Sequence, residues 1–489
     1  MALVNTLLKL AIRRRSHNLC NEDKNVPLSL CLLRSTAAVL ALLSFVLAGA
    51  KAADHKTAPV RRGSDDRFKA DLLLVIAHPD DETGDIGGYL ARAIFDQHRR
   101  VAVVCTTRGD GGGDSVSNNR GAALGAKREI EARQAFTYLG ISDVWFVGAP
   151  DTGGGVLSSL ERWNHGLVLG EVVRIMRLTR PEVVLTWLPD YVAGENHGDH
   201  QASSVIATEA FDLAGDPTAF PEQITAEGLG SWQPQKIYYF SDAFDAGGYW
   251  INHAPKPSPF RKNFLEGTGP TYLPTEISPS RHVSYARLCA EETAFYLTQS
   301  GGSIAKKALE RDDLKLFEFP VHIIFGKSLV GGSTTGDVFE AVKAEAIPFP
   351  GRQAFQLVDT EKALLSFGGS WQFYRNFWQV HNIEHLAQLL PTPEVAVESG
   401  EQLHVPLILC NRAEEAETLH LQSVLPDGWI DHTSYDRYPV EPRTCYPIFA
   451  VIDVLATEPS GWKELTWKLD ANGQELGTIM LRVEVVADN

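Results

Sequence analysis

From residue 71 onward, strand-like and helix-like segments alternate along the chain, and this alternation constrains the fold more than any other feature. Short apolar runs between turn-forming residues predict four strands, at residues 71–77, 100–107, 143–150 and 181–189. Segments with helical spacing and end signals predict the helices between and after them, at residues 87–97, 127–140, 167–180 and 200–214. A βαβα order implies a mostly parallel sheet with helices on both faces, so we expect a Rossmann-like α/β domain.

The pattern changes near residue 391 to short alternating strands separated by turn signals such as Pro426-Asp427-Gly428 and Asn472-Gly473. About 100 residues of this pattern are typical of an all-β, Ig-like sandwich. We therefore predict an α/β domain over residues 68–345, a connector over 346–390 and a β-sandwich over 391–489.

The first 52 residues have the features of a targeting segment. An apolar centre follows basic residues and ends at Ala50-Lys51-Ala52, which matches an A-x-A cleavage site. We predict a signal peptide at residues 1–52, a secreted or periplasmic protein, and no transmembrane span after its removal. An uncleaved N-terminal anchor is the alternative.

Four cysteines lie beyond the predicted signal peptide, and none of them forms a CxxC pair. Cys410 and Cys445 could form a disulfide in an oxidising compartment, or remain buried thiols. The overall net charge is −16, and the basic N-terminus leaves about −21 on the rest of the chain. So acidic a chain argues against nucleic acid as a partner.

Polar clusters follow each of the four predicted strands. The sequences are His78-Pro79-Asp80-Asp81-Glu82, then Arg108 to Gly113, then Asp151, and finally Glu195 to His200. Because the carboxyl ends of parallel strands open onto one edge of a sheet, we expect these clusters to converge there.

The residue types in these clusters suit a divalent metal. Imidazole and carboxylate together favour zinc, and a catalytic site needs three protein ligands. His78 and Asp81 supply two, and either His197 or His200 completes the set. A remaining carboxylate, Asp80 or Glu82, would act as the general base.

Other kinds of site lack their motifs. The chain has no G-x-S-x-G nucleophile elbow, and the first strand-to-helix turn has no G-x-G-x-x-G dinucleotide motif. In "HNIEH", residues 381–385, the glutamate is displaced from its place in H-E-x-x-H, so we interpret these histidines as structural.

At this point the motifs become recognisable. "AHPDDE", "TRGDGG", "GAPD" and "HGDH", each after one strand, resemble the PIG-L/LmbE family of zinc-dependent N-deacetylases over roughly residues 68–300. That family includes enzymes that act on N-acetylglucosamine in glycolipid and thiol-sugar precursors. The resemblance implies an N-acetylated sugar or glycoconjugate as substrate and Zn²⁺ as cofactor.

Carried over by position, the resemblance implies a role for each site residue. The implied zinc ligands are His78, Asp81 and His200. Asp80 would be the general base, and His197, oriented by Asp199, would stabilise the oxyanion or protonate the leaving amine. The implied substrate contacts are Arg108, Asp110 and Asp151.

The sequence departs from the family at two positions. Gly198 replaces a common proline and should loosen that turn, and Tyr296 stands where relatives often have a histidine. The C-terminal sandwich resembles Ig-like domains appended to carbohydrate-active enzymes, and could contact glycans or only pack against its neighbour.

Two other functions stay open. One is a glycan-binding surface protein with a non-catalytic α/β domain. The other is a zinc amidase acting on a non-sugar amide.

Overall fold

The computed structural model describes residues 65–84, 86–190, 197–241, 268–351, 364–389 and 393–486. The signal peptide predicted at residues 1–52 lies outside these ranges. Among the described residues, no helix has both the length and the apolar character needed to cross a membrane.

A six-stranded sheet with the order β3-β2-β1-β4-β5-β8 forms the centre of the first part of the chain. Strands β1 to β5 pair in parallel, and β8 pairs antiparallel with β5 at one edge. The strands span Leu72–Ile76 (β1), Val101–Cys105 (β2), Val144–Phe146 (β3), Val183–Trp187 (β4), Lys236–Phe240 (β5) and Ile324–Ser328 (β8).

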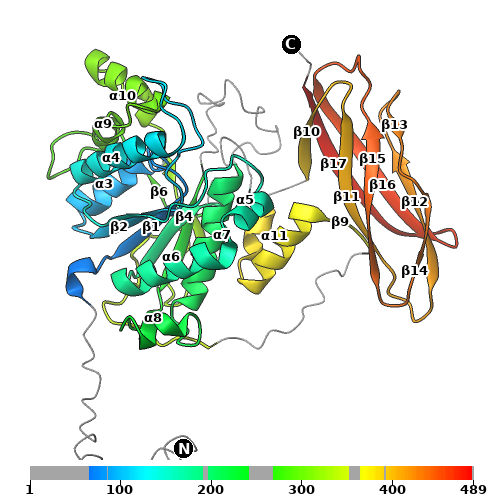
Figure 1. Cartoon of the computed structure of the whole chain (residues 1–489), viewed down its shortest axis with the longest axis horizontal. Coiled ribbons are helices and arrows are strands. Elements are labelled where there is room, and N and C mark those ends of the chain that lie inside the picture. Colours follow the sequence, from blue (N-terminus) through cyan, green and yellow to red (C-terminus); the bar gives the residue numbers. More distant parts are fainter. Residues whose placement is uncertain are drawn as a thin grey trace, which may run out of the picture. The chain divides into compact units, whose positions relative to one another are not determined.

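Helices cover both faces of this sheet, and Figure 1 shows α3 and α4 on one side and α6 and α7 on the other. Leu72 and Leu74 of β1 pack toward the first layer, and Leu73 and Val75 pack toward the second. Strands buried on both faces explain why the sequence shows continuous apolar runs. The predicted α/β fold with a mostly parallel sheet is confirmed.

The helices of this part are α3 (Gly87–Phe95), α4 (Gly121–Leu139), α5 (Val156–Arg162), α6 (His165–Thr179), α7 (Gly198–Leu213), α8 (Pro221–Thr225), α9 (Tyr285–Thr293) and α10 (Ser300–Arg311). Short elements complete it: 3₁₀ turns at Asp66–Phe68 and Lys315–Phe317, and the pair β6 (Thr271–Tyr272) and β7 (Val321–His322).

The structure and the sequence expectations differ at three places. Helix α4 begins at Gly121, six residues before the predicted start, and α5 was not predicted. Strand β3 ends at Phe146, because Gly148 adopts a positive φ of 79° that interrupts extended backbone.

The C-terminal part is an all-β region of two sheets that share one apolar core. One sheet has the order β10-β17-β16-β12-β14 and the other β13-β15-β11-β9. Its strands span Leu365–Phe367 (β9), Glu394–Glu398 (β10), Gln402–Cys410 (β11), Glu417–Val424 (β12), Ile430–Asp431 (β13), Arg437–Val440 (β14), Cys445–Asp453 (β15), Gly461–Ala471 (β16) and Gln474–Val486 (β17). The predicted all-β region is confirmed, and Cys410 and Cys445, opposite each other on β11 and β15, form a disulfide.

The predicted connector contains ordered elements. Strand β9 pairs with β11 in the sandwich sheet. Helix α11 (Gly369–Val380) follows it, and Tyr374, Phe377 and Trp378 of that helix belong to the α/β core. A 3₁₀ turn at Glu384–Leu389 continues this contact. The domain boundaries drawn from the sequence stay predictions.

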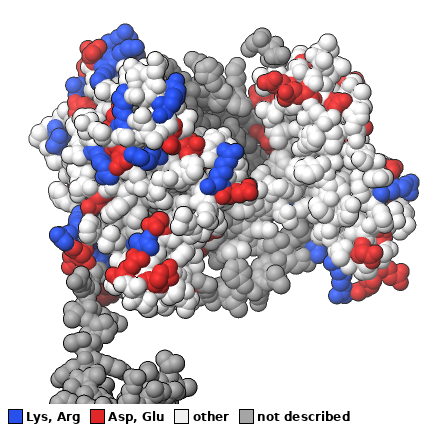
Figure 2. Space-filling view, in the orientation of Figure 1, with Lys and Arg blue, Asp and Glu red and all other residues white. Residues whose placement is uncertain are grey.

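Positive and negative side chains are mixed on the face shown in Figure 2, where Lys and Arg lie beside Asp and Glu over the α/β part. Elsewhere among the described residues, opposite charges form ion pairs, such as Arg174 with both Glu171 and Glu227. The face therefore presents no extended basic patch.

Candidate functional site

The loops that follow β1, β2, β3 and β4 meet at the carboxyl edge of the sheet around a pocket of about 570 Å³. The pocket is lined by His78, Asp80, Asp81, Thr83, Gly111, Gly112, Gly113, Ser115, Arg128, Asp151, Thr152, Gly153, Trp187, His197, His200, Gln299, Ser300 and Gly301. All four predicted clusters thus contribute to one site.

The two carboxylate oxygens of Asp81 have different environments. Oδ2 accepts hydrogen bonds from the backbone N–H groups of Ala77 at 2.8 Å and His78 at 3.0 Å, and from Nε1 of Trp187 at 2.7 Å. Oδ1 faces two imidazole nitrogens instead. Three donors on one oxygen fix the carboxylate and leave the other oxygen directed toward the histidines.

Asp81, His78 and His200 bring three ligand atoms into a nearly equilateral triangle. Asp81 Oδ1 lies 3.3 Å from His78 Nδ1 and 3.2 Å from His200 Nε2, and the two nitrogens are 3.1 Å apart. Ligands held tetrahedrally at about 2.0–2.2 Å from one zinc ion are about 3.4 Å apart. The donor set and its spacing therefore fit a zinc ion.

The second ring nitrogen of His78 faces two carboxylates. His78 Nε2 lies 3.6 Å from Asp151 Oδ1 and 3.7 Å from Asp199 Oδ2, and it has no hydrogen bond within the described structure. A histidine that binds metal through one nitrogen commonly directs the other toward a carboxylate. This environment supports metal binding through Nδ1.

Asp199 lies beside His78 and is fixed by hydrogen bonds from Thr152 and Ser159. It is buried, and its carboxylate accepts hydrogen bonds from the Thr152 N–H at 2.8 Å, from the Thr152 hydroxyl at 2.7 Å and from the Ser159 hydroxyl. Although burial opposes it, the nearby His78 ring and the hydrogen bonds from Ser159 and Thr152 lower the pKa of Asp199 below its ordinary value. The residue is therefore an ionised carboxylate.

His197 contacts Asp199 through the backbone. The Asp199 N–H donates to His197 Nδ1 at 3.3 Å, so the contact between these two residues runs through the Asp199 main chain. Burial and the neighbouring His200 and His78 lower the pKa of His197 to about 3. Because Nδ1 accepts a hydrogen bond, the neutral ring carries its proton on Nε2.

Asp80 has a strained backbone. Its φ of 95° lies in the left-handed region that side chains rarely adopt, and such strain is concentrated at functional sites. Burial, with the adjacent charge of Asp81, raises the pKa of Asp80 well above its ordinary value. A carboxylate with a raised pKa at the pocket wall is suited to accept a proton.

The three residues predicted to contact substrate occupy different places. Asp151 lines the pocket, and its Oδ2 accepts a hydrogen bond from the Gly111 N–H at 3.0 Å. Arg108 forms an ion pair with Glu129 of α4 at 2.8 Å, and Asp110 packs near Gly125 of the same helix. Neither Arg108 nor Asp110 lines the pocket, so their assignment to substrate stays a prediction without geometric support.

Several pocket residues were not predicted. Arg128 donates to the carbonyl oxygens of Gly109 at 2.6 Å and Gly113 at 2.8 Å, which holds the glycine-rich loop after β2. Gln299 donates to the carbonyl oxygen of Pro79 at 2.7 Å. Arg128 lies at the start of the helix predicted at residues 127–140, and nothing in its local sequence marks it as part of the site.

Glu82, the alternative general base, is fully buried behind the pocket. The Tyr296 hydroxyl donates a hydrogen bond to its carboxylate, and burial raises the pKa of Glu82. Glu82 does not line the pocket, and Asp80 does.

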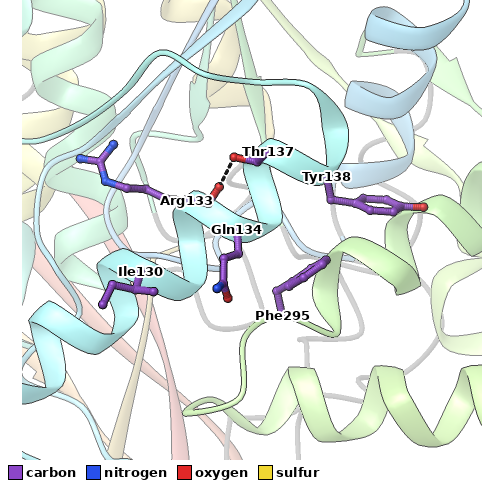
Figure 3. A pocket seen from close by; sticks show the side chains of 6 residues that line it. All are labelled: Ile130, Arg133, Gln134, Thr137, Tyr138 and Phe295. Atoms are coloured by element: carbon purple, nitrogen blue, oxygen red, sulfur yellow. Dashed lines mark hydrogen bonds between the residues drawn. The ribbon is translucent and has the colours of Figure 1, made fainter.

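A second hollow lies along α4 and is shown in Figure 3. Its lining consists of Ile130, Arg133, Gln134, Thr137, Tyr138 and Phe295. This lining has no carboxylate or histidine, so it offers no metal-binding group.

Comparison with known proteins shows that the segment carrying most of the pocket residues matches a protein family. Residues 73–211 match the family described as "PIG-L: GlcNAc-PI de-N-acetylase". Two similar proteins are the 1D-myo-inositol 2-acetamido-2-deoxy-alpha-D-glucopyranoside deacetylases of Streptomyces avermitilis, 32% identical over 184 residues, and Geodermatophilus obscurus, 32% identical over 183 residues.

The alignment with each relative covers 34% of this chain and 60% of the relative, so the similarity spans well under the whole of either protein. Among solved structures, the N,N'-diacetylchitobiose deacetylase from Pyrococcus horikoshii aligns with 18% identity and a TM-score of 0.36. That alignment covers 56% of this chain and 91% of the deacetylase.

Proposed function

We propose that this chain is a metal-dependent hydrolase that removes the acetyl group from an N-acetylated, GlcNAc-type sugar or glycoconjugate. The observation that carries the proposal is the triangle formed by His78 Nδ1, Asp81 Oδ1 and His200 Nε2, with Asp80 and His197 in the same pocket. It lies within the segment that matches a de-N-acetylase family.

His78, Asp81 and His200 would hold the metal, whose chemistry is to polarise an acetamide carbonyl and to lower the pKa of water to about 7. Asp80 would accept the proton of the attacking water and return it to the leaving amine. The neutral His197 would donate its Nε2 proton in a hydrogen bond to the developing oxyanion. The products are acetate and a free amine.

The substrate class is supported by the relatives, whose names describe deacetylases of an acetamido sugar joined to inositol. Two substrate classes can be separated by experiment: acetamido sugars and acetylated amines that carry no sugar. If acetate is released only from acetylated amines that carry no sugar, the substrate is a non-sugar amide and the sugar part of the proposal is wrong.

The Asp80→Asn variant provides the main test. Asn keeps the size of the side chain and tolerates the left-handed backbone, but it cannot accept a proton as a carboxylate does. We expect acetate release to fall by about 10²–10⁴-fold while zinc content, measured by metal analysis, stays at the wild-type level.

The matched control is Asp313→Asn, because Asp313 is exposed and lies outside the pocket lining. Its acetate release should equal that of the wild type. Purified protein that contains no metal, together with unchanged turnover of Asp80→Asn, would exclude the proposal.

We also propose that the protein is exported. The basic and apolar segments before Ala52 support this, as does the disulfide between Cys410 and Cys445, because disulfides persist in oxidising compartments. Cell fractionation with N-terminal sequencing tests the proposal, and a protein that keeps its first residues in the membrane fraction would indicate an anchor instead.

A further inference from the structure

We propose that Trp187 is a positioning residue, which holds the Asp81 carboxylate and the His200 ring in the arrangement that a metal ion requires. The inference rests on the metal site of the proposed function and is independent of the substrate. Trp187 is the last residue of β4 and is 2% exposed.

The first contact is a hydrogen bond between neighbouring strands. Trp187 Nε1 donates to Asp81 Oδ2 at 2.7 Å, and the two residues are separated by 106 positions in the sequence. The other two donors to this oxygen, Ala77 and His78, belong to the same loop as Asp81. Trp187 is therefore the contact that fixes this loop relative to β4.

The second contact is a ring stack. The rings of Trp187 and His200 are 4.1 Å apart and inclined by 5°. The His197 ring is 4.2 Å from the same imidazole but is inclined by 29°, so the indole is the neighbour parallel to it. His200 Nδ1 is buried and has no hydrogen-bond partner among the described residues. Ligand histidines are commonly oriented by a hydrogen bond to this second nitrogen. At His200, ring stacking on Trp187 takes its place.

Trp187 is itself held from two sides. Its backbone carbonyl accepts a hydrogen bond from the Ser204 hydroxyl of α7, the helix that carries His200. Its ring packs on Phe240 with the ring centres 4.5 Å apart. The Trp187 side chain thus contacts two of the proposed metal ligands, Asp81 in the loop after β1 and His200 on α7.

Two variants separate the contacts. Trp187→Phe keeps an aromatic ring beside His200 but loses the hydrogen bond to Asp81, and Trp187→Leu loses both. We expect zinc affinity, measured on the full chain by competition with a chelator, to fall by about 10–100-fold in the first variant and further in the second. The visible spectrum of the cobalt-loaded protein should change in both.

Trp232→Phe is the matched control. Trp232 Nε1 also donates to a single acceptor at 2.7 Å, the carbonyl oxygen of Pro181, which lies before the start of β4 and away from the pocket. Its zinc affinity should stay within about twofold of the wild type. Its metal-free melting temperature should fall about as much as that of Trp187→Phe.

Equal zinc affinities for the wild type and Trp187→Phe would overturn the positioning role and leave the metal site intact. A wild type that binds no zinc would overturn the proposed function and this inference together. If Trp187→Phe does not fold, Trp187→His is compared with Trp187→Leu. The histidine retains a flat ring with an N–H, so equal affinities of these two variants would also overturn the role.

Discussion

The two oxygens of Asp81 show how single atoms determine the properties of this site. One oxygen accepts three hydrogen bonds, and the other faces His78 and His200. The backbone at the neighbouring Asp80 is strained, with a φ of 95°. At the residue scale, two adjacent carboxylates thus differ in their backbone conformation and in their hydrogen-bond partners.

Gly198 is tightly packed, which differs from the expectation for this residue. From the sequence, a glycine in place of proline is expected to loosen the turn. A Cβ atom at position 198 would lie 1.8 Å from the carbonyl oxygen of Gly154 and 2.5 Å from the carbonyl carbon of Gly155. The turn is therefore tightly packed, and the glycine allows the loop after β3 to lie against the start of α7.

The Gly198→Ala variant should displace the loop that carries Asp151 and Thr152. We expect about a 100-fold loss of the proposed deacetylase activity, because displacement of catalytic groups by about 1 Å has effects of this size. Gly155→Ala is the control, since a Cβ there meets no atom within 4 Å. Full activity of Gly198→Ala would show that the loop tolerates displacement.

Much of the site could be predicted because its residues follow strands in recognisable motifs. The structure brings His78, Asp80, Asp81, Asp151, His197 and His200 to one pocket. Trp187 and Arg128 could not be predicted, because their roles depend on contacts between distant segments. An indole at the end of an apolar strand is also typical of a core residue.

At the scale of secondary-structure elements, α11 is a helix that the sequence pattern did not predict. Its buried residues belong to the α/β core, and a cluster of ion pairs lies at its C-terminal end. Asp212 at the end of α7 contacts His381 Nδ1 at 2.5 Å and Lys327 Nζ at 2.5 Å, and Lys327 also donates to the His381 carbonyl oxygen at 3.0 Å. Three elements distant in sequence meet at this cluster, so no local pattern predicts it.

The contribution of this cluster to stability should depend on pH. Burial alone would raise the pKa of Asp212, but the hydrogen bond with His381 and the charge of Lys327 lower it below 3.8. A lowered folded pKa gives a stabilisation that is present above 3.8 and is lost as the pH falls toward the folded value. Asp212→Asn should therefore lower the unfolding free energy by about 1–2 kcal/mol at neutral pH, and by less below about pH 4.

Urea unfolding of both proteins between pH 7 and pH 3 measures this difference. Asp313→Asn is a suitable control, because Asp313 is exposed and lies 3.9 Å from Lys315, also exposed. It should unfold as the wild type does at every pH. If the difference in unfolding free energy between Asp212→Asn and the wild type stays constant with pH, the lowered pKa of Asp212 is not its cause.

At the scale of the whole molecule, the chain forms separate apolar cores in the α/β part and in the sandwich. The disulfide Cys410–Cys445 lies in the sandwich, whereas Cys105 and Cys289 of the α/β part are buried and not disulfide-bonded. Separate cores in one chain commonly unfold in separate steps.

Replacing both Cys410 and Cys445 by serine should destabilise the sandwich by about 2–4 kcal/mol, because the bond closes a segment with a sequence separation of 35. Calorimetry should show one transition moving to lower temperature while the other keeps its position. Acetate release at 25 °C should not change. A shift of both transitions would show that the two cores unfold as one unit.

Strand β9 has a consequence for how the chain can be divided. The chain enters the sandwich sheet at Leu365–Phe367, reaches the α/β core through α11, and returns to the sandwich at β10. A fragment that begins at residue 391 would lack β9, so the neighbouring edge of β11 would be left open for pairing with another copy. Gene fusions and recombination events that treat the C-terminal region as an interchangeable module should therefore make their junction before residue 364.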